Sequence, residues 1–260
     1  LREKDGVLHI VTSNRTASTL DYWKFPTDGL FEYFQNLPLD SFTEDLDHAH
    51  LEAGMDIYGI CMGLVGGNLR AILTEEEGKT IQYWDLKTQE IIGTIDITAE
   101  ETNVPLFGNE AEGCVIDDEN EHIIVSREGM RGILNAYDAN TLEFIKVIDS
   151  RSGNIGGDPE GVTVYKTTDK EGFIIVSSQG DSKFNLYSRQ FPFDYIRSFT
   201  VNDVTDTDGI DVTNKSIDGL FPQGFLVVQD GYNSPDNQNF KIVDMDQVLK
   251  KKVMNPGSTD

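Results

Sequence analysis

Basic residues are scarce in this chain. Its 260 residues include 21 Lys and Arg against 45 Asp and Glu, which gives a formal net charge of −24. Nucleic-acid binding requires Lys and Arg to displace the counterions of the phosphate backbone, so this charge excludes nucleic acid as a partner. The same excess of anions argues against an anionic membrane surface as a partner.

Long apolar runs and a leader segment are also missing. No stretch approaches the ~18 consecutive apolar residues of a membrane-spanning helix. Hydrophobic residues make up 38% of the chain, which is enough to bury the core of one domain. The chain begins at Leu1 without Met or an apolar leader. We therefore expect a mature or excised segment of a secreted protein, extracellular or periplasmic, whose signal peptide is not in this segment.

Cysteine is nearly absent. Cys61 and Cys114 are the two cysteines of the chain, too few for a disulfide framework. Each follows the glycine of a repeated motif described below, so both are expected on buried strands. Since cysteine is among the most buried residue types, we expect two free thiols rather than a disulfide.

A four-residue motif of acid, any residue, acid and glycine recurs along the chain. Its three copies begin at Glu110, Asp158 and Asp206, each 48 residues after the one before. A related block, Asp56-Ile57-Tyr58-Gly59, begins 54 residues before the first copy. A period near 50 indicates a repeat architecture, and each copy opens a run of β-prone residues. The sequence therefore predicts an all-β fold, a β-propeller of four-stranded antiparallel blades.

The strand pattern predicts about five blades. Three blades are complete, the opening set and the last set show three runs each, and the acidic segment 35–53 is predicted to be a loop; the five sets span residues 7–34, 58–97, 114–148, 162–201 and 210–243. A short helix is expected from Asp246 to Lys252. We assign residues 1–253 to one propeller domain and residues 254–260 to a linker-like tail.

The repeated acids predict a metal site. The inner strands of all blades line one central channel, so carboxylates at the same point of each blade converge on the axis. Like charges packed that closely need compensation, and calcium is the usual cation for ligands that are all oxygen. The motif glycines alone indicate only the fold, because any propeller needs them for backbone geometry.

Several segments together resemble the β-propeller phytases. These segments are residues 109–119, 158–165, 175–180, 205–212, 225–231 and 237–241, and the resemblance extends from about Val7 to Val248. It implies a six-bladed fold that hydrolyses phytate, inositol hexakisphosphate, with several calcium ions in the channel mouth. The family's first blade, with its Asp-Asp-Pro motif and a phosphate-binding Lys, has no counterpart in this chain. We therefore expect an incomplete domain, as in one part of a dual-domain phytase.

The resemblance also implies which residues form the site. Six side chains match the ligands of catalytic calcium: Glu112, Glu128, Asp158, Glu160, Gln179 and Asp208. The residues expected to be catalytic are Tyr58, Glu112, Glu128, Glu160 and Asp208. Arg15 matches an arginine that binds substrate phosphate. A structural calcium site is partly matched by Asn237, Gln238 and Asn239.

The chain departs from the family at two positions. A lysine that contacts phosphate in the family is replaced here by Glu76, a reversal of charge at the substrate. A calcium-binding aspartate aligns with Asn202, and the adjacent Asp203 could substitute for it as a metal ligand.

Three functions follow from these observations. The first is calcium-dependent hydrolysis of phytate or lower inositol phosphates, with weak activity for this chain alone. The alternative is an accessory module that binds calcium and inositol phosphates beside a complete phytase domain in the same polypeptide. The third is an interaction platform, which so many unpaired carboxylates on one axis argue against.

Two other candidate sites have simpler interpretations. Ser177 and Ser178 lack a suitably placed histidine, so a serine nucleophile is disfavoured. His48 and His50 could bind a transition metal, but a solvated surface loop is the simpler reading of their acidic segment.

Overall fold

The computed structural model describes residues 1–28, 47–100, 109–217, 219–233 and 237–250. Within these ranges the chain forms five antiparallel sheets, four with four strands and the last with three. Each sheet is built from consecutive strands paired in chain order. The prediction of an all-β propeller with about five blades is thus confirmed. No helix in the described ranges is both long and apolar enough to cross a bilayer.

The strands have the following bounds. The first sheet contains β1 (Arg2–Lys4), β2 (Val7–Asn14), β3 (Thr19–Pro26) and β4 (Asp47–Glu52). The second contains β5 (Ile57–Val65), β6 (Asn68–Glu75), β7 (Thr80–Asp85) and β8 (Glu90–Asp96). The third contains β9 (Ala111–Asp117), β10 (His122–Arg127), β11 (Ile133–Asp138) and β12 (Phe144–Ser150). The fourth contains β13 (Asp158–Lys166), β14 (Gly172–Gln179), β15 (Lys183–Ser188) and β16 (Tyr195–Phe199). The fifth contains β17 (Ile210–Thr213), β18 (Phe225–Asp230) and β19 (Asn239–Asp244), followed by helix α2 (Met245–Lys250).

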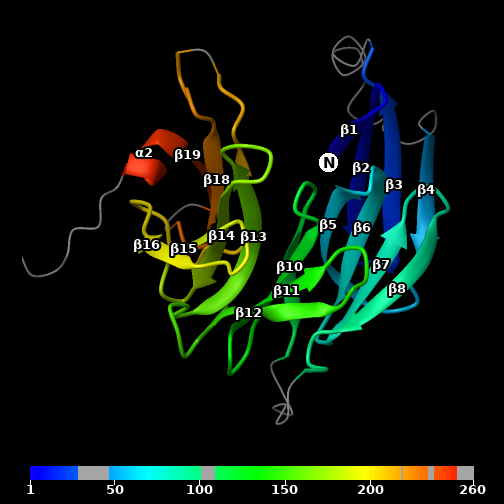
Figure 1. Cartoon of the computed structure of the whole chain (residues 1–260), viewed down its shortest axis with the longest axis horizontal. Helices are drawn as coiled ribbons and strands as arrows, with labels where there is room; N and C mark the ends of the chain where they lie inside the picture. The colour runs from blue at the N-terminus through cyan, green and yellow to red at the C-terminus, as the bar shows by residue number, and fades with distance from the viewer. Residues whose placement is uncertain (29–46, 101–108, 218, 234–236, 251–260) are drawn as a thin grey trace, which may run out of the picture.

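The sheets succeed one another in chain order, with their first strands turned inward (Figure 1). The first strands of successive sheets lie side by side: β5 against β9, β9 against β13 and β13 against β17. Apolar side chains fill the space between neighbouring sheets. Leu20 and Leu73, for example, pack between the first two sheets, and Ile72 and Ile116 between the second and third. This arrangement brings the beginnings of the inner strands together at one end of the molecule.

One predicted loop contains a strand. β4 lies inside the segment 35–53 and pairs antiparallel with β3. The composition of β4 does not indicate a strand. His48, His50 and Glu52 point away from the core, and only Leu51 packs against the apolar cluster between the first two sheets. The predicted run at 30–34 and the tail at 254–260 lie outside the described residues.

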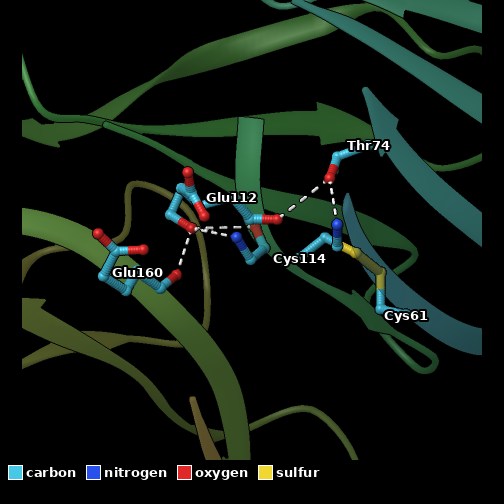
Figure 2. The surroundings of a disulfide bond; sticks show 8 residues. Cys61, Thr74, Glu112, Cys114 and Glu160 are labelled. Carbon is cyan, nitrogen blue, oxygen red and sulfur yellow. Dashed lines mark hydrogen bonds between the residues drawn. A yellow bond between two sulfur atoms is a disulfide. The ribbon is translucent and has the colours of Figure 1, made fainter. Parts of the chain in front are cut away.

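The expectation of two free thiols is wrong. Cys61 on β5 and Cys114 on β9 form a disulfide, with their Cα atoms 5.7 Å apart (Figure 2). The two strands belong to different sheets and lie side by side as inner strands. Sequence spacing shows that each cysteine is on an inner strand, but not that the two face each other across the boundary.

Candidate metal and phosphate site

The predicted site residues lie at one end of the sheets. Tyr58, Glu112 and Glu160 lie near the beginnings of the inner strands β5, β9 and β13. The others lie just before an inner strand or at the end of a second strand: Asp208 before β17, Glu128 after β10, Gln179 at the end of β14 and Arg15 after β2. Each sheet therefore contributes to the same end of the molecule.

The motif glycines allow neighbouring sheets to approach closely. A Cβ added to each would collide with the carbonyl oxygen of the second acid in the next repeat: Gly59 with Glu112 at 2.1 Å, Gly113 with Glu160 at 2.4 Å and Gly161 with Asp208 at 2.6 Å. Gly209, in the last copy of the motif, has nothing within 4 Å of its added Cβ. The glycine is thus required wherever a following sheet packs against it.

A buried hydroxyl supports each of these contacts. These bridging hydroxyls belong to Thr74, Ser126 and Ser177, near the ends of the second strands. Thr74 Oγ1 accepts from the amide of Gly59 at 2.7 Å and donates to the Glu112 carbonyl at 3.4 Å (Figure 2). Ser126 makes the same bridge between the amide of Gly113 and the carbonyl of Glu160. Ser177 donates to the carbonyl of Asp208 at 2.7 Å, while the amide of Gly161 donates to that carbonyl directly.

The bridging hydroxyls were not recognised as functional from the sequence. The signal that could have found them is a Ser or Thr closing an aliphatic run in each second strand. Because they hold the backbone of Glu112, Glu160 and Asp208, they position the side chains of the predicted ligands. Ser177 is fully buried with its hydroxyl on a backbone carbonyl, so it is placed as a structural group and not as a nucleophile.

Four glutamates form what we call the carboxylate cluster: Glu110, Glu112, Glu128 and Glu160. Carboxylate oxygens of the first three lie within 4.8 Å of one another. Glu112 and Glu160 are 5% and 7% exposed, and their carboxyl groups are close enough to share a hydrogen bond. Figure 2 shows these two side chains on neighbouring strands. Glu110 was not among the predicted ligands, although it is the first acid of its repeat.

The pKa values of Glu112, Glu128 and Glu160 are all raised. Burial raises the pKa of Glu112 and Glu160, and nearby carboxylates raise both further. Burial, followed by the charge of Asp158, likewise raises the pKa of Glu128. The negative charge of Glu112 is the main reason that the pKa of Tyr58 is raised to about 12. Negative charge is therefore under-compensated here, as expected for a site that holds cations.

Asp158 differs from the cluster because it has a cation of its own. Arg151 forms an ion pair with Asp158, and the amide of Gly129 donates to the same carboxylate oxygen at 3.3 Å. These residues, with Glu128 and Met130, line an open cavity of about 500 Å³. The predicted ligands Asp158 and Glu128 thus share one solvent-accessible hollow.

Asp208 is surrounded by amides. Gln179 Nε2 donates to the carboxylate of Asp208, and the backbone amide of Asp208 donates to Gln229 Oε1 at 2.8 Å. Burial and the charge of Asp206 raise the pKa of Asp208. Asp203, the predicted substitute ligand, is exposed in the preceding loop. Among the described contacts, no hydrogen bond or ion pair joins Asp203 to Asp208.

Arg15 is held between two neighbours. Its guanidinium lies 4.7 Å from the centroid of the Tyr58 ring, a cation–π contact. It also forms an ion pair with Glu76. Glu76 therefore contacts the arginine that is predicted to bind phosphate.

The segment predicted to hold a structural calcium lies beside a buried carboxylate that the sequence did not suggest. Asn239 lies opposite Asp230 in the pairing of β19 with β18. Asp230 is 1% exposed, and its Oδ2 and the Oδ1 of Asn239 are buried without a hydrogen-bond partner. Lys241 Nζ lies 3.4 Å from Asp230 Oδ2. Asn237 and Gln238 directly precede Asn239, so the predicted segment adjoins two buried oxygens without hydrogen-bond partners, one of which is ion-paired with Lys241.

The sequence matches the phytases. The profile of the phytase family matches residues 45–256. A 3-phytase of Bacillus subtilis (strain 168) is 31% identical over 198 residues, which cover 71% of this chain and 50% of the relative. The chain thus spans about half the length of this relative.

Solved structures show the same fold at low identity. A functionally unknown protein of Desulfotomaculum acetoxidans DSM 771 has a TM-score of 0.52 and 11% identity, over 90% of this chain and 65% of that one. The hydrazine synthase of Kuenenia stuttgartiensis has a TM-score of 0.54 and 11% identity, over 90% and 62%. At such identity the likeness concerns the fold alone. The match of the family profile over most of the chain decides the relationship: the chain belongs to the phytase family.

Proposed function

We propose that this protein hydrolyses phosphate monoesters of inositol phosphates, phytate included, in a calcium-dependent reaction. The observation that carries the proposal is the carboxylate cluster: two buried and two half-buried glutamates from two neighbouring sheets, with too little positive charge around them. The likeness to a 3-phytase supports the choice of substrate.

The donor atoms fit calcium. The cluster, together with Asp158, Gln179 and Asp208, offers carboxylate and amide oxygens without sulfur or imidazole, which is the ligand chemistry that calcium prefers. Burial and mutual repulsion disfavour ionised carboxylates in the cluster, and a bound cation would reverse that preference. Asn239 Oδ1, which is buried without a hydrogen-bond partner, fits a further ion in the same way. When bound, calcium supplies positive charge that attracts an anionic substrate and polarises a phosphoryl oxygen.

The side chains of this protein bind and orient the substrate in this proposal. Arg15 binds a substrate phosphate through its guanidinium, a fork of donors suited to phosphate oxygens. The ring of Tyr58 supports that guanidinium from one face. The bridging hydroxyl of Ser126 fixes the backbone of Glu160, so that its carboxylate stays in place. Water accepts the phosphoryl group, since the buried Ser177 hydroxyl is engaged with backbone.

One contact favours a second candidate function. Glu76 already occupies Arg15 in an ion pair, so a substrate phosphate must compete with a carboxylate for the same guanidinium. This competition fits a chain of weak activity, or an accessory module that binds inositol phosphates beside a complete phytase domain in the same polypeptide. In either case we infer a secreted protein, because disulfides persist in oxidising compartments.

Phosphate release from phytate, with calcium or with chelator, tests the proposal. Glu160→Gln removes one charge from the cluster with little change of shape, and Glu90→Gln makes the same change at the exposed start of β8 as a control. We expect release only with calcium, its loss in Glu160→Gln and its retention in Glu90→Gln. Calcium-dependent binding of phytate without turnover would support the accessory function. Absence of both binding and turnover would refute both functions.

A further inference from the structure

The outer strand of the first sheet presents two histidines on one face. His48 and His50 are two residues apart on β4, so their side chains lie on the same side of the strand. Their ring centroids are 5.0 Å apart, with the rings nearly perpendicular. Glu52 follows two residues later on the same face. Leu51, on the opposite face, packs against the apolar cluster between the first two sheets, which fixes which face is presented.

A buried carboxylate orients one of these rings. Asp21, on the neighbouring strand β3, is 6% exposed, and its Oδ1 lies 2.7 Å from His50 Nδ1. Thr19 Oγ1 donates to the same oxygen at 2.7 Å, and Asn14 Nδ2 donates to Oδ2 at 3.2 Å. An ionised carboxylate only accepts hydrogen bonds, so Nδ1 of His50 carries the hydrogen and Nε2 of the neutral ring is the atom with a lone pair.

An aromatic side chain supports the other ring. Trp23 stacks on His48 with centroids 5.0 Å apart and 21° between the planes. The edge of Trp23 also meets His50 at 6.4 Å. Both imidazoles are thus held by neighbours on β3, one by an indole and the other by a carboxylate.

We propose that His48 and His50, together with Glu52, bind a divalent transition-metal ion such as Zn²⁺. Imidazole nitrogen suits zinc, nickel and copper, whereas calcium takes oxygen ligands. A ligand histidine whose other ring nitrogen donates to a carboxylate is the usual arrangement around such metals, and Asp21 provides it for His50. This site lies on an outer strand, apart from the inner strands that carry the carboxylate cluster, and it does not depend on the proposed function.

Two measurements test this site in protein saturated with calcium, so that the oxygen ligands are occupied. Zn²⁺ binding is followed by calorimetry, and Cu²⁺ binding by quenching of tryptophan fluorescence. The chain has two tryptophans, and Trp84 is 3% exposed in the core. The Trp84→Phe variant therefore assigns the signal to Trp23, which touches the proposed ligands. We expect binding of one Zn²⁺ per chain and strong quenching by Cu²⁺.

The variants make the test decisive. His48→Gln and His50→Gln should each weaken Zn²⁺ binding at least tenfold, and Asp21→Asn by about tenfold to a hundredfold, the usual effect of losing such a carboxylate. His122→Gln, a change on β10 in the third sheet, should bind as wild type does. Far-UV circular dichroism verifies the fold, and if Asp21→Asn does not fold, the two histidine variants decide alone. Unchanged affinity in both, or no binding by wild type, would overturn the proposal and leave ring packing as the role of these residues.

Discussion

Gly113→Ala should loosen the contact between the third and fourth sheets. Its Cβ would lie 2.4 Å from the carbonyl oxygen of Glu160, whereas Cβ atoms essentially never come closer than 3.0 Å and ordinary contacts begin at 3.4 Å. The backbones must therefore separate by about 0.6 to 1 Å, and overpacking of this kind costs about 1–3 kcal/mol. For a domain of this size, 1 kcal/mol lowers the melting temperature by about 2–4 °C, so a drop of about 2–12 °C is expected.

The same shift should impair the site. Glu160 belongs to the carboxylate cluster, and a displacement of about 1 Å in a site of this kind can reduce turnover by about a hundredfold. We therefore expect Gly113→Ala to lose both thermal stability and phosphate release from phytate in saturating calcium.

Gly209→Ala is the matched control. Gly209 closes the same four-residue motif, and neither glycine has a positive φ, so alanine strains neither backbone. Nothing lies within 4 Å of the added Cβ at Gly209, and this variant should melt at or slightly above the wild-type temperature. Equal melting temperatures for the two variants, measured by calorimetry, would refute the idea that the glycine serves close approach of the next sheet.

Further predictions concern charge, substrate and the disulfide. In chelator, the free energy of unfolding should fall as pH rises from about 4.5 through about 9, because folded Glu112 and Glu160, with their raised pKa values, keep protons that the unfolded chain releases; a flat profile of thermal melts contradicts this. Calcium should raise the melting temperature, and an unchanged melt in excess EDTA would count against converging ligands. Glu76→Gln should lower the Michaelis constant for phytate about two- to fivefold at low salt, because Arg15 loses its ion-pair partner, and Glu76→Lys should lower it further. Unchanged kinetics in both variants would show that Glu76 does not affect substrate binding. Cys61→Ser with Cys114→Ser should cost about 4 kcal/mol in denaturant titrations, from the entropy of the loop between them; a loss below about 1 kcal/mol would show that the sheets alone fix this boundary.

The fold could be predicted because a sequence motif repeats along the chain at a period close to the length of one blade. The acid-x-acid-glycine motif opens the third, fourth and fifth sheets and a related block opens the second, since each inner strand meets the next in the same way. β4 escaped prediction because strand patterns are recognised by apolar alternation, and an edge strand with Leu51 as its inward anchor shows little of it.

The site could be predicted only in part. Convergence of Glu112 and Glu160 follows from the repeat, because equivalent positions of successive blades are neighbours. The bridging hydroxyls bind backbone carbonyls, which every residue has, so no partner residue marks them in the sequence. The contact of Glu76 with Arg15 joins loops of two different sheets. Sequence spacing does not encode such a contact.

The disulfide has a consequence for assembly. The segment that it closes, from Cys61 to Cys114, contains all of β6, β7 and β8. Repeat proteins can exchange equivalent elements between copies, and blades of similar shape are natural candidates for such domain swapping. Once Cys61 and Cys114 are joined, these three strands form a closed covalent loop anchored to the third sheet of their own chain. The oxidised molecule therefore cannot exchange β6, β7 and β8 with a neighbouring copy as an open segment. The reduced molecule can still undergo this domain swap.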